Sequence, residues 1–204
     1  EGVGVRRGDL VLVPTMTFAA TAEVVRYFDA TPVFVDCEPR TLAMDPQAMD
    51  RTLAGIASGR PVAGLRPPYG RVGAVIPVHY RGVVADMEGV LAVAARHGVG
   101  IVEDAAHAFP ARRRGASGTW THAGAFGRVG CCSFYANKCL TTGEGGMAVT
   151  DDQALADRMR VMSLHGMDRD AWKRFRSEGS WYYEIIAPGY KYNLTDMAAA
   201  LGLS

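Results

Sequence analysis

Short apolar runs alternate with segments of helical periodicity along most of this 204-residue sequence. A continuous apolar run of about four to eight residues is typical of a buried strand, and apolar residues three or four positions apart are typical of a helix. The runs predict strands at residues 9–14, 31–37, 72–80, 100–106, 130–136 and 146–151. The periodic segments predict helices at residues 18–29, 45–55, 86–98 and 152–166.

These elements together predict one architecture. Because the strand runs are continuous rather than alternating, both faces of the sheet are expected to be covered. The repeated strand-then-helix order predicts an α/β fold, a three-layer sandwich with a mostly parallel sheet. Local signals agree with this, since Asp45 and Pro46 indicate a helix start and Gly98 indicates a helix end.

Composition indicates a globular protein and argues against several partners. Hydrophobic residues make up 49% of the chain and charged residues 21%. The formal net charge of +1 gives no electrostatic reason to expect nucleic acid or an anionic membrane surface as a partner. The triplet Arg112–Arg114 is interpreted as a solvated loop, with a phosphate-binding role as the lesser alternative. No apolar stretch reaches the roughly 18 residues that predict a membrane span.

The four cysteines, Cys37, Cys131, Cys132 and Cys139, form no CxxC pair and have no histidine partners at metal-ligand spacing. We therefore expect neither a metal site nor a disulfide framework. Adjacent cysteines within an apolar run are typical of small buried residues in a reducing compartment, so the cytoplasm is the expected location.

Sheets of this kind bind ligands at the carboxyl ends of their strands, where the loops begin. That rule selects four segments for closer inspection, because one site can draw on all of them. They are residues 15–18, 79–81, 104–107 and 133–138.

Lysine is rare in this chain. It accounts for three of the 22 basic residues, at positions 138, 173 and 191, and arginine accounts for the rest. Lys138 lies in "SFYANKCLTTGEGGM", directly after an apolar run. An amine, unlike a guanidinium group, can lose its proton and attack a carbonyl to form a Schiff base. The alternative interpretation of Lys138 is a solvated loop cation.

Asp104 follows "GIVE", where a strand is expected to end. A carboxylate there is either a cap for the following turn or the partner that keeps the pyridine nitrogen of a pyridoxal cofactor protonated. His107 lies three residues further on, so a turn would bring it to the same side as Asp104. A structural hydrogen-bonding role is the alternative for this histidine.

Ser133 precedes Lys138 by five residues and lies at a predicted strand end, where a hydroxyl suits a phosphate oxygen. The glycines at 143, 145 and 146 allow close approach of the backbone to a ligand, or serve a hairpin turn. Phe18 follows "PTMT" and suits stacking on a planar ring, although an aromatic residue at a helix start is also typical of a core.

In this order and spacing, the segments resemble one family. The sequence is similar to the DegT/StrS-type sugar-nucleotide aminotransferases, fold-type-I enzymes that depend on pyridoxal 5'-phosphate (PLP). The segments that carry the resemblance are "PTMTFAATAEVVRYFDATPVFVD", "VIPVHYRG", "VEDAAHAFPA", "SFYANKCLTTGEGGM", "SLHGM" and "GYKYNLTDMAAALGL". Members that form 4-amino-4-deoxy-arabinose are the most similar in these motifs. The resemblance implies transfer of an amino group, usually from glutamate, to a keto sugar nucleotide.

The resemblance also implies roles for individual residues. Lys138 would form the Schiff base with the cofactor and move the proton. Asp104 would pair with the pyridine nitrogen, and His107 would lie near the ring hydroxyl. Phe18 would stack on the ring, and Ser133 would bind the cofactor phosphate.

Asn193, in "YKYNLTD", would reach the cofactor phosphate of the neighbouring subunit, which implies a homodimer with a shared active site. A helix is expected to begin near Thr195 and to pack back onto its own subunit. Measured against the family, residues 1–204 correspond to the large PLP-binding domain, truncated at both ends. The phosphate-cradling segment upstream and the small C-terminal domain would lie outside it.

Three other functions remain open at this point. A PLP-dependent sugar dehydratase of the same family is disfavoured by Lys138, because such relatives replace the lysine. A catalytically silent fragment with a regulatory or binding role is the second. A Rossmann-type nucleotide-binding domain is the third, and the absence of a GxGxxG motif after the early strands argues against it.

Overall fold

The computed structural model describes residues 1–168 and 183–204, and these form two compact units. The first unit consists of residue 1 with residues 3–150, and the second of residue 2 with residues 151–204. Lys173 lies outside the described residues. That the chain is one PLP-binding domain of a longer protein stays a prediction.

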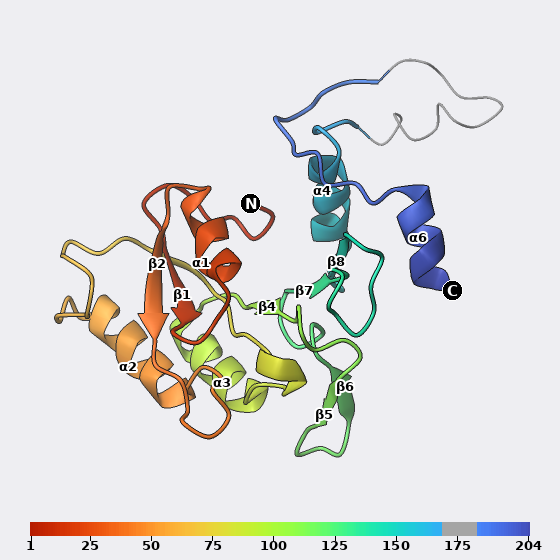
Figure 1. The fold of residues 1–204 in the computed structure, drawn as a ribbon. Coiled ribbons are helices and arrows are strands. Elements are labelled where there is room, and N and C mark those ends of the chain that lie inside the picture. Colours follow the sequence, from red (N-terminus) through yellow and green to blue (C-terminus); the bar gives the residue numbers. More distant parts are fainter. Residues whose placement is uncertain (169–182) are drawn as a thin grey trace. The chain divides into compact units, whose positions relative to one another are not determined.

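The first unit is built on parallel strands (Figure 1). Strand β1 (Leu10–Pro14) lies between β2 (Thr31–Val35) and β3 (Val72–Val75), and both neighbours run parallel to it. All five residues of β1 are buried, as expected for a central strand with both faces covered.

A second group of strands continues from the first. Strand β4 (Val102–Asp104) pairs in parallel with β7 (Val129–Ser133), and β8 (Gly146–Val149) runs antiparallel to β7. Two parallel bridges, Val75 with Ile101 and Val78 with Asp104, join the β3 segment to the β4 segment. The expected mostly parallel sheet is therefore confirmed within this unit.

Three helices of this unit cover the two faces of the sheet. They are α1 (Ala19–Arg26), α2 (Pro46–Ala57) and α3 (Met87–His97). Their predicted boundaries are confirmed to within a few residues. Asp45 accepts a hydrogen bond from the Gln47 N–H at 2.9 Å, and Gly98 ends α3 at φ 64°, a conformation that glycine adopts without strain.

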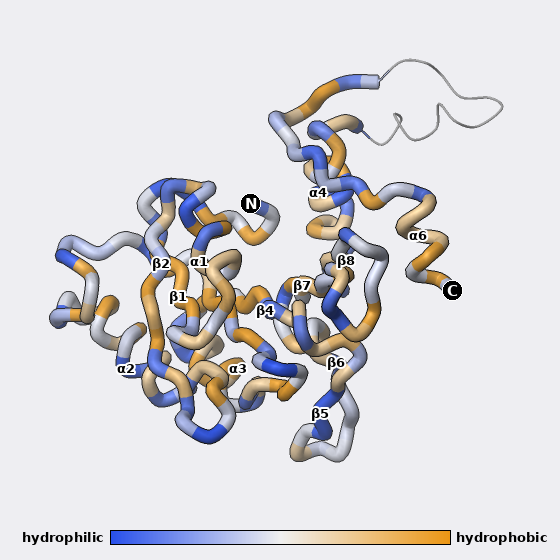
Figure 2. Tube along the Cα trace, in the orientation of Figure 1, coloured by the Kyte–Doolittle hydropathy of each residue, from blue (hydrophilic) through white to orange (hydrophobic). Residues whose placement is uncertain are grey.

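Successive side chains of β1 enter different cores, because neighbours on a strand point to opposite faces. Leu12 belongs to the cluster that contains residues of α2 and α3, whereas Val13 belongs to the cluster that contains Val25 of α1. In Figure 2 the apolar colours follow these packed elements and the polar colours gather in the connecting loops. This arrangement confirms the three-layer sandwich.

The interpretation of Arg112–Arg114 as a solvated loop is wrong. These residues form strand β5, which pairs antiparallel with β6 (Trp120–His122). The hairpin is anchored by Arg113, whose guanidinium donates to the Ala85 carbonyl at 2.9 Å, and the Arg112 guanidinium lies 5.2 Å from the centre of the Trp120 ring. The paired residues lie six to ten positions apart, and the apolar periodicity of the sequence does not identify such partners.

The second unit contains α4 (Gln153–Ser163) and α6 (Asp196–Leu203). In the segment before α6, the Tyr190 and Tyr192 N–H groups donate to the carbonyls of Met162 and Ser163 at the end of α4. Thr195 caps α6 as predicted. The helix is apolar over most of its length (Figure 2), and none of its residues is buried. Its expected packing onto its own subunit stays a prediction.

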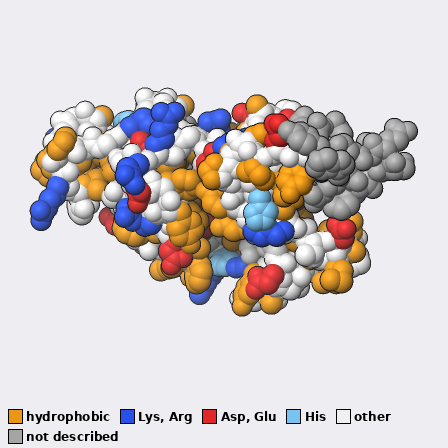
Figure 3. Space-filling view, turned by 90° about the horizontal axis from the view of Figure 1, so that it is seen from above, with side chains coloured by type: hydrophobic (Ala, Val, Ile, Leu, Met, Phe, Trp, Pro, Cys, Tyr) orange, Lys and Arg blue, Asp and Glu red, His pale blue; other side chains and the backbone are white. Residues whose placement is uncertain are grey.

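Charged side chains are mixed on the surface. Figure 3 shows one face, on which basic groups lie interspersed with acidic ones, in keeping with the net charge of +1. Within residues 1–168 and 183–204, no helix is long and apolar enough to cross a membrane.

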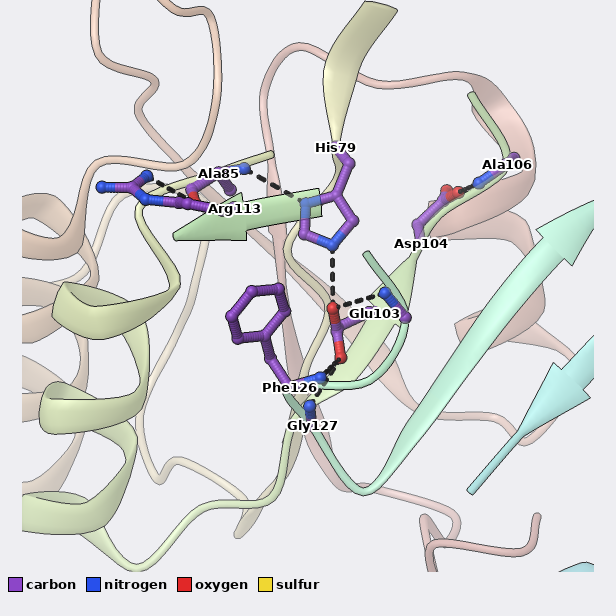
Figure 4. A network of polar contacts seen from close by, with 9 residues as sticks. His79, Ala85, Glu103, Asp104, Ala106, Arg113, Phe126 and Gly127 are labelled. Atoms are coloured by element: carbon purple, nitrogen blue, oxygen red, sulfur yellow. Dashed lines mark hydrogen bonds and ion pairs between the residues drawn. The ribbon is translucent and has the colours of Figure 1, made fainter. Parts of the chain in front are cut away.

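One buried carboxylate fixes several of these elements together. The side chain of Glu103, in β4, is fully buried and accepts four hydrogen bonds. Three come from the backbone N–H groups of Gly124, Phe126 and Gly127, and the fourth joins it to His79 Nε2 at 2.8 Å (Figure 4).

The tautomer of His79 follows from its second contact. The Ala85 N–H donates to His79 Nδ1 at 3.2 Å, so Nδ1 carries no proton and the ring hydrogen lies on Nε2. His79 therefore donates to Glu103 as a neutral ring. A buried carboxylate needs this many donors to offset the loss of its hydration.

Glu103→Gln should lower the free energy of unfolding by roughly 2–4 kcal/mol, because the amide NH₂ of glutamine must face N–H donors in place of an acceptor oxygen. Urea denaturation of the full-length protein measures this change. Glu23→Gln, at an exposed position of α1, is the matched control and should stay within about 0.5 kcal/mol. Equal stability of the two variants would contradict the role of Glu103.

Candidate functional site

Asp104 ends β4 and points away from the Glu103 network (Figure 4). Its backbone is fixed on both sides, since its N–H donates to the Pro77 carbonyl and its carbonyl accepts from the His79 N–H. Its side chain is oriented as well: Oδ1 accepts from the Ala106 N–H at 3.1 Å and Oδ2 from the Thr21 hydroxyl at 2.7 Å. Because each carboxylate oxygen has two lone pairs, Asp104 can still accept from a ligand N–H.

Sequence reasoning missed Thr21. It is buried in the first turn of α1, and its hydroxyl lies 2.6 Å from that of Thr17. The available signal was the presence of two hydroxyl residues, Thr17 and Thr21, four positions apart at the predicted helix start. The partner of Thr21 was not readable, since Asp104 is 83 residues away along the chain.

Strand β7 presents two polar side chains next to Asp104. Cys131 is paired in register with Asp104, and Ser133 lies two residues further along. Since the side chains of a strand alternate, Cys131 and Ser133 share one face. The Tyr135 N–H donates to Ser133 Oγ at 3.3 Å, a contact that leaves the hydroxyl hydrogen to donate elsewhere.

The thiol of Cys131 has solvent-accessible surface, yet the surrounding protein desolvates its charged form. This desolvation, followed by the Asp104 carboxylate, raises the pKa of Cys131 to about 11. The thiol is therefore protonated at neutral pH, so it is an uncharged neighbour of Asp104 and not a nucleophile.

Lys138 lies in the loop that joins β7 to β8. This loop closes on Phe134, whose N–H donates to the Gly145 carbonyl and whose carbonyl accepts from the Thr142 N–H. Gly143 turns the chain at φ 79°. Lys138 is half-buried, and its backbone N–H donates to the Tyr135 carbonyl at 3.0 Å. Its side-chain amine makes no hydrogen bond or ion pair with any residue in 1–168 or 183–204.

Two aromatic residues lie near the same strand ends. Phe18 directly precedes α1 and is 78% exposed. His107 is exposed in the turn after Asp104, and its ring centre lies 6.4 Å from that of Tyr80. Both rings are thus accessible to a ligand.

Asn193 belongs to the second unit, whereas the other candidate residues belong to the first. Its Oδ1 accepts a hydrogen bond from the Lys191 ammonium. Its role toward a neighbouring subunit stays a prediction.

The donor set fits PLP. A carboxylate already oriented by two donors suits the ring N–H, an uncommitted amine suits the cofactor carbonyl, and a serine hydroxyl with a free hydrogen suits a phosphate oxygen. Asp104 and Ser133 lie at the carboxyl ends of the neighbouring parallel strands β4 and β7, and Lys138 lies in the loop after β7. This is the edge at which α/β sheets bind ligands.

Comparisons with known proteins identify similar sequences and folds. The chain is 45% identical over 201 residues to the spore coat polysaccharide biosynthesis protein SpsC of Bacillus subtilis, covering 98% of this chain and 46% of SpsC. It thus spans about half the length of this relative.

Solved structures support the fold. Spr1654 of Streptococcus pneumoniae, in its PMP form, aligns with a TM-score of 0.80 and 30% identity, over 98% of this chain and 50% of that one; a PLP form is also known. DesI, crystallised in the presence of its TDP-sugar product, aligns with a TM-score of 0.72 and 32% identity, and the alignment covers 99% of this chain and 43% of DesI. The expected fold-type-I architecture is confirmed.

The sequence profile of the DegT/DnrJ/EryC1/StrS aminotransferase family matches residues 1–204 in full. With the fold and the donor set described above, the chain belongs to this family of PLP-dependent sugar aminotransferases.

Proposed function

We propose that the protein transfers an amino group from an amino acid, glutamate, to the keto group of a sugar nucleotide, forming an amino sugar for surface polysaccharide, lipid or secondary-metabolite synthesis. The observation that carries this proposal is that two neighbouring parallel strands end near two complementary groups. One is the Asp104 carboxylate, oriented by two donors, and the other is the Lys138 amine, which has no hydrogen-bond partner among the described residues. Because the chain spans about half of SpsC, the proposal concerns the full-length protein.

PLP supplies an electron sink that stabilises a carbanion at the amino-bearing carbon. The protein groups prepare and exploit that property. Asp104 would accept a hydrogen bond from the ring nitrogen and keep that nitrogen protonated. Lys138 would bind the cofactor at its carbonyl carbon. Once displaced by the amino donor, its amine would carry the proton from the amino-bearing carbon of the donor to the carbonyl carbon of the cofactor.

The remaining residues bind and orient. Ser133 would donate its hydroxyl hydrogen to a phosphate oxygen of the cofactor. Phe18 would stack on its ring, and His107 would lie near the ring hydroxyl. The protonated Cys131 thiol puts no second negative charge next to Asp104, so the attraction between that carboxylate and the ring N–H is not weakened.

The substrate class is supported by the relatives. DesI was crystallised with a TDP-sugar product, and SpsC takes part in spore coat polysaccharide biosynthesis. For this chain we propose a homodimer in the cytoplasm, with Asn193 of one subunit reaching the cofactor phosphate of the other. Four free cysteines suit a reducing compartment.

Lys138→Ala in the full-length protein should abolish amino transfer and covalent attachment of the cofactor. Lys138→Arg should do the same, because a guanidinium group stays protonated and cannot attack a carbonyl. Half-reaction kinetics with glutamate measure the first effect. Lys191→Arg is the control and should retain most of the activity. Turnover of either Lys138 variant near the wild-type rate would contradict the proposal.

Asp104→Asn should leave PLP able to bind but slow proton removal by about two orders of magnitude or more, because a neutral amide does not hold the ring nitrogen protonated. Single-turnover absorbance changes give the rate. Asp45→Asn is the matched control, since asparagine caps a helix about as well as aspartate does. A rate within a few-fold of wild type would show that Asp104 is only a cap.

A further inference from the structure

The hydroxyl of Thr21 has one hydrogen and two possible partners. Its Oγ1 lies 2.7 Å from Asp104 Oδ2 and 2.6 Å from Thr17 Oγ1. Thr21 is 4% exposed, so water does not compete freely for either contact. The direction of both hydrogen bonds therefore depends on whether the Asp104 carboxylate can donate a hydrogen or only accept one.

An ionised carboxylate only accepts hydrogen bonds. Oδ1 of Asp104 already faces the Ala106 N–H, which only donates. With Asp104 ionised, Thr21 gives its hydrogen to Oδ2, and the contact with Thr17 must be donated by Thr17. The result is a directed chain from Thr17 to Thr21 to Asp104, in which each bond polarises the next.

Thr21 lies in the first turn of α1, where the helix carries partial positive charge, and that turn contains no acidic residue of its own. The Asp104 carboxylate, hydrogen-bonded to Thr21, is attracted to this turn. These hydrogen bonds also fix the rotation of the Asp104 carboxylate, because Oδ1 accepts from the Ala106 N–H and Oδ2 from the Thr21 hydroxyl, which belong to different segments.

We propose that Thr21 is a positioning residue for amino transfer, and that Thr17 orients Thr21. Thr21 fixes the rotation of the Asp104 carboxylate, so that its free lone pairs face the position that the N–H of the cofactor ring would take. This inference rests on the proposed function, because it acts through Asp104. It gives residues 15–21, "TMTFAAT", a second role in addition to the proposed stacking of Phe18 on the ring.

The test uses three variants of the full-length protein. Thr21→Val removes the hydroxyl at nearly constant volume, Thr21→Ser keeps it, and Thr17→Val removes only the donor behind it. Thr52→Val is the matched control, since the Thr52 hydroxyl bonds to the Ala48 carbonyl within α2. The readouts are the PLP dissociation constant, the pH midpoint of the visible absorbance band of bound PLP, and kcat with KM for both substrates.

Thr21→Val should weaken PLP binding and lower kcat by about tenfold each, a loss typical of one hydrogen bond to a charged group, with little change in KM. The pH midpoint of the visible band should shift, because that band responds to the charge opposite the ring nitrogen. Thr21→Ser should restore all three, Thr17→Val should show a smaller change of about threefold, and Thr52→Val should show none.

Wild-type PLP affinity and kcat in Thr21→Val would overturn the inference, as would a Thr21→Ser variant as impaired as Thr21→Val. Should Thr21→Val fail to fold, Thr17→Val and Thr21→Ser still decide, because wild-type behaviour of Thr17→Val contradicts the directed chain. If amino transfer is slow in Asp104→Asn but normal in Thr21→Val, the inference about Thr21 is wrong and the proposed function stands. If the rate of amino transfer is normal in both variants, the proposed role of Asp104 is wrong as well.

Discussion

The carboxylate of Glu103 is the interaction on which the site depends. It is fully buried, and removing it from water is costly unless donors surround it. Its four donors come from His79 and from residues 124–127, so one side chain ties the end of β4 to the chain after β3 and to the segment before β7. These are the segments whose ends carry the candidate residues. The strand ends are thus held in place without help from a ligand.

Strand alternation gives the next residue the opposite environment. Glu103 faces the interior and has its donors supplied by the protein, whereas Asp104 faces the other side with lone pairs to spare. Two adjacent carboxylates thereby serve different tasks, one structural and one suited to a cofactor. The parallel register with β7 then brings Cys131 and Ser133 alongside Asp104, and the loop after β7 carries Lys138.

Much of this arrangement was predictable from local sequence. Continuous apolar runs predicted the strands, and the helix signals at Asp45 and Gly98 proved correct, because both depend on neighbours within a few residues.

The hairpin at Arg112–Arg114 and the contact of Thr21 with Asp104 were missed, because each depends on partners that periodicity does not identify. Glu103 was passed over for the same reason, since its donors lie 21–24 residues away. Lys138 and Asp104 were predicted from residue type, position at strand ends and family resemblance.

The most direct test of the account is chemical trapping of the cofactor on the protein. Full-length protein is incubated with PLP, reduced with borohydride and digested, and the peptides are analysed by mass spectrometry. The account predicts stoichiometric addition of the reduced cofactor to the peptide that contains Lys138, and none to those with Lys173 or Lys191. Label distributed over all three lysines, or absent from Lys138, would contradict it.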